Sequence, residues 1–287
     1  MENRLYQSSY LAEILKKFNF SFSKSLGQNF LIDGNIVKNI VEKSGITKDD
    51  IVLEIGPGFG TLTEELALNV KKVISIEKDH RLMEVLDYTL RNYDNVKIIN
   101  GDFLKTELEK IFLEEAKGQK LKVVANLPYY ITTPILERII ENKKYFSTIS
   151  VMVQEEVARR VVASPNNKDY GSLTLYLKYN CNSEILIKVP KTVFMPSPNV
   201  DSAILYLELV DRDFDVDEDY LFKFIRSGFT KRRKNIMNSL STGFVDVSKA
   251  QLKEILSSLE LSGNLRAENL SLEDYINITK KYTEMIK

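Results

Sequence analysis

Short apolar segments alternate along the first two thirds of the chain with segments whose apolar residues recur at helical spacing. Each apolar segment is about as long as a buried strand and is bounded by glycine or polar residues. Strands are predicted at residues 51–55, 72–77, 96–102, 121–126, 148–154, 183–189 and 201–209. Because short strands that alternate with helices form crossover units, the pattern predicts an α/β fold with a mostly parallel sheet and an antiparallel edge.

One helical pattern has clear ends. Its apolar residues fall on one helix face, at Ile36, Val37, Ile40 and Val41. Asp33 precedes the pattern and is a predicted N-cap, and Gly45 follows it and is a predicted helix end.

An acidic segment, DRDFDVDEDY at residues 211–220, separates the strand pattern from a C-terminal region of helical pattern. Such a change in composition is typical of a domain boundary. The sequence therefore predicts an N-terminal extension at 1–23, an α/β domain at 24–210 and a small helical domain at 211–287.

The composition is that of a globular protein, with 287 residues, 44% of them hydrophobic and 28% charged. The single cysteine, Cys181, excludes an internal disulfide and fits a reducing compartment. The chain has one cysteine and one histidine, His80, as soft or imidazole ligands, so we expect no metal site. No apolar segment reaches the roughly 20 residues of a membrane helix, and the N-terminus lacks the apolar core of a signal peptide. We therefore expect a cytoplasmic protein.

The charges balance over the whole chain, with 40 Lys and Arg residues against 40 Asp and Glu residues, but they are segregated. Between residues 221 and 245 there is no acidic residue. The basic residues of that segment are Lys223, Arg226, Lys231, Arg232, Arg233 and Lys234. This run alone fits a solvated face as well as it fits a nucleic-acid contact.

A glycine-rich turn, EIGPGFG, follows the first strand and contains Gly56, Gly58 and Gly60. Glycines at a strand end let the backbone approach a ligand and direct N–H groups at it. The spacing G-x-G-x-G differs from the G-x-G-x-x-G of dinucleotide-binding folds. Glu77 ends the second strand, where a carboxylate can accept two ribose hydroxyls in either kind of site. A tight turn without a ligand is the remaining interpretation.

Asp102 distinguishes between these interpretations. It ends the third predicted strand, beside Glu77 at the carboxyl edge of the sheet, where open α/β folds bind ligands. Its carboxylate can accept a hydrogen bond from an adenine amine. A glycine loop, a ribose acid and an adenine acid on three consecutive strands form an S-adenosylmethionine site, although Asp102 alone would suit a turn after Gly101.

Six motifs run in order from residue 24 to residue 271. They are KSLGQNFLID (24–33), EIGPGFGTLTEEL (54–66), NLPYYITTP (126–134), VFMPSPNVDSA (193–203), GFTKRRKNIMNSL (228–240) and LRAENLS (265–271). Together they resemble the ribosomal RNA adenine dimethyltransferases. The resemblance implies a Rossmann-like class I methyltransferase domain with a seven-stranded, mostly parallel sheet and a small C-terminal all-α domain. It also implies dimethylation of N6 on two adjacent adenosines near the 3′ end of 16S rRNA, with S-adenosylmethionine as cofactor, during 30S subunit assembly.

The segment NLPYY, residues 126–130, suits this reaction. An adenine amine is a weak nucleophile that has to be oriented rather than deprotonated. The Asn126 side-chain oxygen can accept one N–H, and Pro128 makes the backbone rigid. Tyr129 offers a face for stacking, of order 1–3 kcal/mol per base. By analogy with the family, the Leu127 carbonyl accepts the second N–H; Tyr130 has no assigned role.

The resemblance adds further site residues. Phe194 is expected to close the other face of the target base. The cofactor contacts are expected at Asn29, Leu31, Gly56, Gly58, Glu77, Asp102 and Asn126. Phosphate contacts with the small-subunit rRNA are expected at Arg226, Lys231, Arg232, Arg233 and Lys234. We expect a monomer that binds neither metal nor membrane.

Three alternatives remain open. A large-subunit methylase of the erythromycin-resistance type shares the glycine loop and an N-[IL]-P-[YF] motif, whereas the motifs after residue 193 favour the small-subunit family. A mainly non-catalytic assembly factor would bind the 30S subunit without needing the intact site. A nicotinamide dehydrogenase is disfavoured by the glycine spacing. The aromatic residues before residue 24 could order on RNA, but the sequence does not assign them.

Overall fold

The computed structural model describes residues 4–23, 27–231 and 233–286. The strands within these ranges are β1 (Phe30–Leu31), β2 (Ile51–Ile55), β3 (Lys72–Glu77), β4 (Val96–Asn100), β5 (Leu121–Asn126), β6 (Phe146–Gln154), β7 (Cys181–Val189), β8 (Phe194–Met195) and β9 (Ser202–Leu209). The helices there are α1 (Ser8–Lys17), α2 (Gly34–Lys43), α3 (Thr61–Ala67), α4 (Met83–Thr89), α5 (Leu108–Lys110), α6 (Thr132–Glu141), α7 (Glu155–Val162), α8 (Ser172–Asn180), α9 (Glu218–Thr230), α10 (Ile236–Leu240), α11 (Lys249–Ser258) and α12 (Leu272–Ile286).

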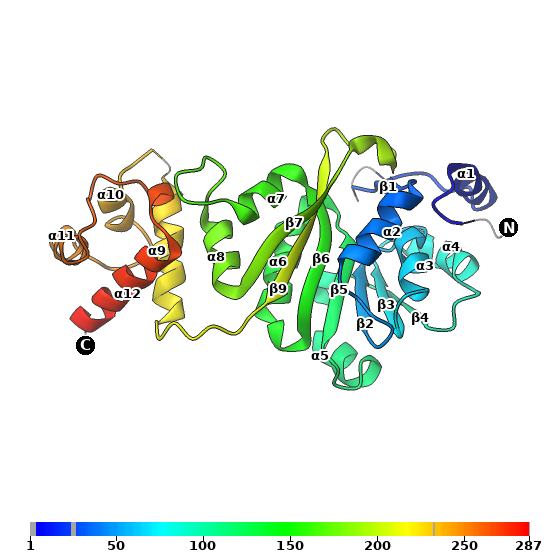
Figure 1. Ribbon diagram of the computed structural model, residues 1–287, viewed down its shortest axis with the longest axis horizontal. Coiled ribbons are helices and arrows are strands. Elements are labelled where there is room, and N and C mark those ends of the chain that lie inside the picture. The colour runs from blue at the N-terminus through cyan, green and yellow to red at the C-terminus, as the bar shows by residue number, and fades with distance from the viewer. Residues whose placement is uncertain (1–3, 24–26, 232, 287) are drawn as a thin grey trace. The chain divides into compact units, whose positions relative to one another are not determined.

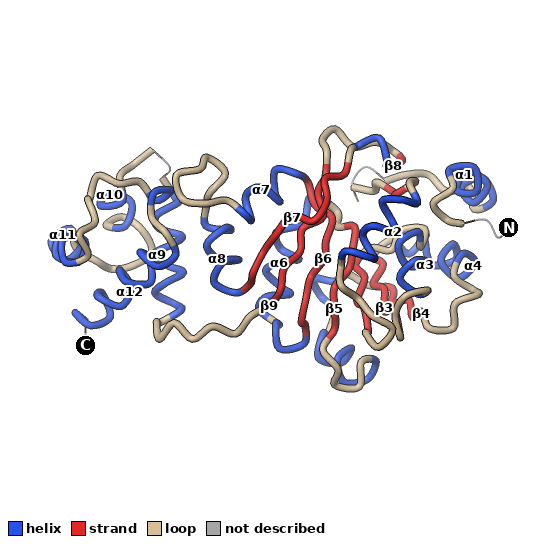
Figure 2. Tube along the Cα trace, in the orientation of Figure 1, coloured by secondary structure: helices blue, strands red, loops and turns tan. Residues whose placement is uncertain are grey.

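Seven of these strands form one sheet in the order β4-β3-β2-β5-β6-β9-β7 (Figures 1 and 2). The neighbours from β4 to β6 are parallel, and β9 is antiparallel to β6. The predicted α/β fold with a mostly parallel sheet and an antiparallel edge is confirmed. All seven predicted strands are present, with ends within two residues of those predicted.

Helix α2 has the ends that its sequence predicts. The Asp33 side chain accepts hydrogen bonds from the N–H groups of Asn35 and Ile36, as expected of an N-cap. Gly45 follows the helix with a φ of +64°, the left-handed conformation that commonly ends helices. The apolar face of α2 packs with α3 on the sheet, in a cluster that includes Val37, Leu62, Leu66, Val73 and Val124.

The short strands β1 and β8 form an antiparallel pair that the strand pattern did not predict. Leu31 lies opposite Phe194, and Phe30 lies opposite Met195. This pairing attaches the segment before α2 to the chain that leads into β9, and it fixes residues 27–31 near the functional residues described below.

The chain divides into two compact units. One comprises residues 1–158 and 184–209, and the other comprises residues 159–183 and 210–287. The second unit therefore includes α8 in addition to the C-terminal helices α9 to α12, whereas the sequence pattern placed the break after residue 210. The physical reason is packing, because Tyr170, Leu175 and Tyr179 belong to the same apolar cluster as buried residues of α9 and α12.

Among the described residues, no helix has the length and apolar character needed to cross a membrane.

Candidate active site

One pocket collects the loops that follow β2, β3, β4 and β5, together with the segment around β1. The predicted site residues that line it are Asn29, Leu31, Gly56, Gly58, Glu77, Asp102, Asn126, Leu127, Pro128 and Tyr129. These residues are spread over a hundred positions of sequence, and the parallel strands bring them to one edge of the sheet.

The glycine loop after β2 has no room for a side chain at its central position, Gly58. Gly58 has a φ of +61°, and a Cβ built on it would lie 2.6 Å from the Phe30 ring. The Gly58 N–H donates to Oε2 of Glu77 over 3.2 Å. The missing side chain thus allows the backbone amide to reach the carboxylate at the end of the next strand.

The Glu77 carboxylate is held in one orientation. Its Oε1 accepts a hydrogen bond of 2.7 Å from the Asp79 N–H, while its Oε2 accepts the one from Gly58. Burial raises the pKa of Glu77, and these two amide hydrogen bonds oppose the rise. A carboxylate has about four acceptor sites, so Glu77 keeps acceptor capacity for a ligand hydroxyl, which fits the predicted ribose contact.

Asp102 lies two residues beyond the end of β4, and its carboxylate already has partners. Oδ1 accepts from the Leu104 N–H over 3.0 Å, and Oδ2 forms an ion pair of 3.0 Å with Lys78. Burial acts to raise the pKa of Asp102, but the hydrogen bonds from Lys78 and Leu104 outweigh it, so the pKa lies below its usual value. The group is therefore an ionised acceptor at the pocket wall.

Asn126 ends β5, and its side chain is oriented by the β1 segment. Its Nδ2 donates to the main-chain oxygen of Asn29 over 2.9 Å. Among the described residues, the Asn126 side-chain oxygen has no hydrogen-bond partner. Because the amide nitrogen is committed to Asn29, the oxygen is left as the acceptor on the pocket side.

The residues after Asn126 form a rigid corner. The Leu127 N–H donates to the Met152 carbonyl over 3.2 Å, and the Leu127 side chain is buried. Pro128 has a φ of −60° and begins a single 3₁₀ turn. The Tyr129 hydroxyl lies 2.6 Å from Oγ of Ser202, which fixes the position of its half-buried ring at the pocket.

Phe194, in β8, and Tyr130, next to Tyr129, are placed differently from Tyr129. Phe194 is 3% exposed, packs in the apolar cluster beside Leu31, and is not among the residues that line the pocket. Tyr130 does line the pocket; it is 51% exposed, and its ring is next to Gly27. The structure therefore does not bring Phe194 to the pocket, and it places Tyr130 at the pocket rim.

Two polar side chains of the pocket were not found from the sequence. Glu54, in β2, accepts from the hydroxyls of Thr63 over 2.6 Å and Ser75 over 2.8 Å. Burial raises its pKa to about 7, against those hydrogen bonds. Thr61 begins α3, and its buried hydroxyl has no hydrogen-bond partner among the described residues. An acid inside an apolar strand directly before a glycine loop was the available signal for Glu54.

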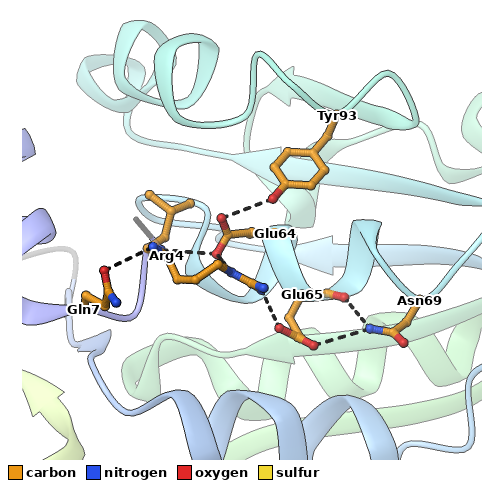
Figure 3. A network of polar contacts seen from close by, with 7 residues as sticks. Arg4, Gln7, Glu64, Glu65, Asn69 and Tyr93 are labelled. Carbon is orange, nitrogen blue, oxygen red and sulfur yellow. Dashed lines mark hydrogen bonds and ion pairs between the residues drawn. The ribbon is translucent and has the colours of Figure 1, made fainter. Parts of the chain in front are cut away.

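The N-terminal segment is folded onto the same unit (Figure 3). Arg4 forms ion pairs with Glu64 over 2.9 Å and Glu65 over 2.6 Å, and the Tyr93 hydroxyl donates to the other oxygen of Glu64. The aromatic rings that follow α1 continue towards the glycine loop, with Phe20 on Phe59 and Phe22 on Phe30. In the described part of the segment that the sequence left unassigned, Arg4 and the aromatic side chains thus pack on the rest of this unit.

The basic residues predicted to contact RNA belong to the second unit. Arg226, Lys231, Arg233 and Lys234 are exposed to solvent, and Arg232 lies outside the described residues. Within the described ranges, none of these four forms an ion pair with a carboxylate.

No group of three or more potential metal ligands occurs in the described part of the chain.

Comparison with known proteins gives consistent results. The family model of ribosomal RNA adenine dimethylase matches residues 19–284. A protein of Alkaliphilus metalliredigens named ribosomal RNA small subunit methyltransferase A is 43% identical over 286 residues, which cover 97% of this chain and 98% of that protein. A protein of Clostridioides difficile with the same name is 43% identical over 275 residues, covering 95% of each.

Solved structures show the same relationship. A dimethyladenosine transferase from Plasmodium falciparum superposes with a TM-score of 0.75 at 26% identity, covering 89% of this chain and 98% of that one. The 23S rRNA methyltransferase ErmE superposes with a TM-score of 0.68 at 28% identity, covering 88% of this chain and 99% of that one.

Proposed function

The chain belongs to the ribosomal RNA adenine dimethylase family, and we propose that it dimethylates N6 of two adjacent adenosines near the 3′ end of small-subunit rRNA. It is an rRNA adenine dimethyltransferase that uses S-adenosylmethionine. The observation that supports methyl transfer to an adenine amine most directly is the orientation of Asn126, whose amide nitrogen is committed to Asn29 and whose oxygen is left as an acceptor in the pocket.

The pocket residues fit S-adenosylmethionine. The Thr61 hydroxyl lines the pocket and is buried without a partner among the described residues, so a polar group of the cofactor can hydrogen-bond to it. The backbone at Gly58 is bare where a Cβ would collide, and Glu77 is fixed with acceptor capacity to spare. We propose that Gly56, Gly58, Glu77 and Asp102 bind the cofactor, together with Asn29, Leu31 and Asn126.

S-adenosylmethionine, when bound, supplies a methyl group that is already activated by the sulfonium. The work of the protein is therefore to orient the adenine amine. We propose that the Asn126 oxygen and the Leu127 carbonyl accept the two N–H groups, so that the nitrogen lone pair turns out of the ring plane. Pro128 and the Leu127 N–H bond to Met152 keep these acceptors in place.

The target base needs a stacking face, and Tyr129 supplies it. Its hydroxyl contact with Ser202 holds the ring while the base enters. The role predicted for Phe194, closing the opposite face, requires this buried side chain to move from its cluster beside Leu31. We retain it as a proposal that the Phe194→Ala variant tests through the KM for RNA.

The substrate and setting follow the relatives. The curated relatives are named small-subunit enzymes and are 43% identical, whereas ErmE is 28% identical, so the small subunit is favoured over the large one. A non-catalytic assembly factor is disfavoured because the acceptors and acids of the pocket are all present. We further propose that the second unit binds rRNA through its basic residues, and that the protein acts in the cytoplasm as a monomer without a metal.

The test is methyl transfer from labelled S-adenosylmethionine to undermethylated small subunits, large subunits and naked rRNA. We expect label in the small-subunit rRNA, recovered as N6,N6-dimethyladenosine. Label recovered from the large subunit would support the alternative, and no transfer to any of the three would contradict the proposed function.

A further inference from the structure

Phe244 has the most exposed large apolar side chain among the described residues. Its side chain is 61% exposed, although Val245 and Val247 beside it are buried at 6% and 4%. The residue lies between α10 and α11 in the second unit, in a segment that contains none of the predicted site residues. The ring is therefore held at the surface beside buried neighbours.

The backbone on which Phe244 stands is fixed to α9. The Phe244 N–H donates to Oγ of Ser227 over 2.7 Å, and the same hydroxyl donates to the Lys223 carbonyl over 2.7 Å. Ser227 is fully buried, and Gly243 packs so closely on it that any Cβ there would overlap the Ser227 side chain. The ring is therefore exposed by a well-defined turn of the chain.

The same turn is bordered by cations. The Lys231 ammonium donates to Oγ1 of Thr242 over 3.3 Å, two residues before Phe244. Arg226 is exposed and directly precedes Ser227 on α9, and Lys223 lies one helical turn earlier. Among the described residues, none of these three cations pairs with a carboxylate. The nearest acid in the sequence of this loop is Asp246.

An exposed aromatic ring, with cations that have no carboxylate partner on the adjoining loop and helix, matches one kind of ligand. Nucleobases stack on exposed aromatic rings whatever their identity, and the adjoining phosphates bind Lys and Arg. An apolar protein surface would instead need several exposed apolar neighbours, whereas the neighbours of Phe244 are a threonine, a glycine, a buried valine and an aspartate.

We propose that Phe244 is a base-stacking anchor for an unpaired nucleotide of the rRNA substrate, with Lys223, Arg226 and Lys231 binding the adjoining phosphates. The inference rests on the proposed function and adds to it a mode of RNA binding that uses no residue of the methyl-transfer pocket. Stacking of one base on an aromatic ring changes affinity by about 5-fold to 160-fold, so the effect is measurable.

The experiment compares Phe244→Ala, Phe244→Leu and Phe244→Tyr in the full-length protein. The dissociation constant for undermethylated small subunits is measured at several salt concentrations. We expect Phe244→Ala to raise it by roughly tenfold with an unchanged salt slope, and Phe244→Tyr to stay within about twofold of the wild type. Phe244→Leu keeps apolar area but lacks the ring face, and it should behave like Phe244→Ala.

Two controls make the result specific. Leu113→Ala removes a side chain of similar exposure, 58%, from the other unit and should leave binding unchanged. Lys231→Ala should weaken binding and reduce the salt slope by roughly one phosphate contact, about 0.7–0.9. Because Phe244 is exposed, its variants should keep the thermal stability of the wild type.

The outcomes separate this inference from the proposed function. At saturating concentrations of small subunits, the rate of methyl transfer should be the same in Phe244→Ala and in the wild type. If the wild type transferred no methyl group, that result would contradict the proposed function and leave the binding measurements to test the anchor. Wild-type affinity of Phe244→Ala, or equal binding by the Leu and Tyr variants, would overturn the anchor. A photoreactive phenylalanine analogue at position 244 should crosslink to rRNA; crosslinking to ribosomal protein instead would overturn it as well.

Discussion

The side-chain nitrogen of Asn126 donates to the main-chain oxygen of Asn29 over 2.9 Å, across 97 positions of sequence. This contact decides which end of the amide faces the pocket. A carboxamide that is free to flip would present its N–H₂ to the substrate amine half of the time, and two donors repel each other. The β1 segment thereby makes Asn126 an acceptor.

The first prediction concerns this acceptor. Asn126→Ala should lower kcat by at least about 100-fold, because the adenine amine loses one of the two groups that orient it. Single-turnover transfer to small subunits measures the effect. Binding of the subunit should change by less than a few-fold, and Asn142→Ala, which removes an amide bonded to the Arg138 carbonyl on α6, serves as the matched control. Unchanged turnover in Asn126→Ala would refute the proposed mechanism.

The second prediction compares two glycines with similar backbone angles. Gly58 and Gly45 have φ values of +61° and +64°, but a Cβ on Gly58 meets the Phe30 ring, whereas a Cβ on Gly45 has nothing within 4 Å. In both alanine variants, backbone strain should reduce the unfolding free energy by about 1 kcal/mol. Only Gly58→Ala should weaken S-adenosylmethionine binding, by more than about tenfold, since its amide is displaced from Glu77. Calorimetric titration with the cofactor measures this difference, and equal affinities of the two variants would count against the role of the glycine loop.

The third prediction uses the raised pKa of Glu54. Burial raises this pKa from 4.5, the value of a free glutamate side chain, to about 7, so the folded state binds the proton more tightly. The contribution of Glu54 to stability is therefore lost as the pH rises from about 4.5 to about 7. Glu54→Gln keeps an oxygen for Thr63 and Ser75 and has no charge to bury. Relative to the wild type, it should gain about 3 kcal/mol of unfolding free energy between pH 4 and pH 8. Urea titrations over this range test it, and a difference that does not vary with pH would show that Glu54 is not the titrating group.

The fourth prediction concerns the N-terminal network. Arg4→Ala leaves Glu64 and Glu65 without their shared cation and should reduce the unfolding free energy by about 1–3 kcal/mol. Lys281→Ala removes an exposed i,i+3 partner of Glu284 and should cost no more than about 0.5 kcal/mol. Thermal unfolding of both variants provides the comparison. Equal losses would mean that the Arg4 pairs contribute no more than an ordinary surface pair.

The fifth prediction concerns the basic run of the second unit. Simultaneous replacement of Arg232, Arg233 and Lys234 by Gln should weaken small-subunit binding and flatten its dependence on salt by up to about three phosphate contacts. Filter binding at increasing salt gives the slope. If the slope does not move, this run is only a solvated face of the domain.

The sheet and most of the pocket could be predicted from the sequence because both follow from local patterns. Strand lengths, the glycine loop and the polar residues at strand ends are each readable within about ten residues. Glu77 and Asn126 were therefore located correctly at the ends of their strands. Asp102 was expected as the last residue of a strand and instead follows it, because its side chain caps the next turn through the Leu104 N–H.

The remaining features depend on contacts between distant residues. The pairing of β1 with β8 buries Phe194 beside Leu31, and no periodicity in either short strand indicates it. Residues 159–183 lie between the sheet strands β6 and β9 in sequence, but Tyr170 and Tyr179 find their apolar partners in the C-terminal helices. Thr61 and Glu54 became visible as site residues only when the structure showed what surrounds their oxygens.

The network around Arg4 has a consequence for biosynthesis. Arg4 is separated from its partner Glu64 by 60 positions, and Tyr93, which completes the network, is made later still. At about 5–20 residues per second, the ribosome needs roughly 3 to 12 s to make that intervening chain. During this interval the apolar residues Leu5, Leu11 and Ile14 have no partner helix to cover them. The segment around Arg4 therefore docks only after α3 and α4 have been made, and β4 and β5, which carry the rest of the cofactor site, are made later still.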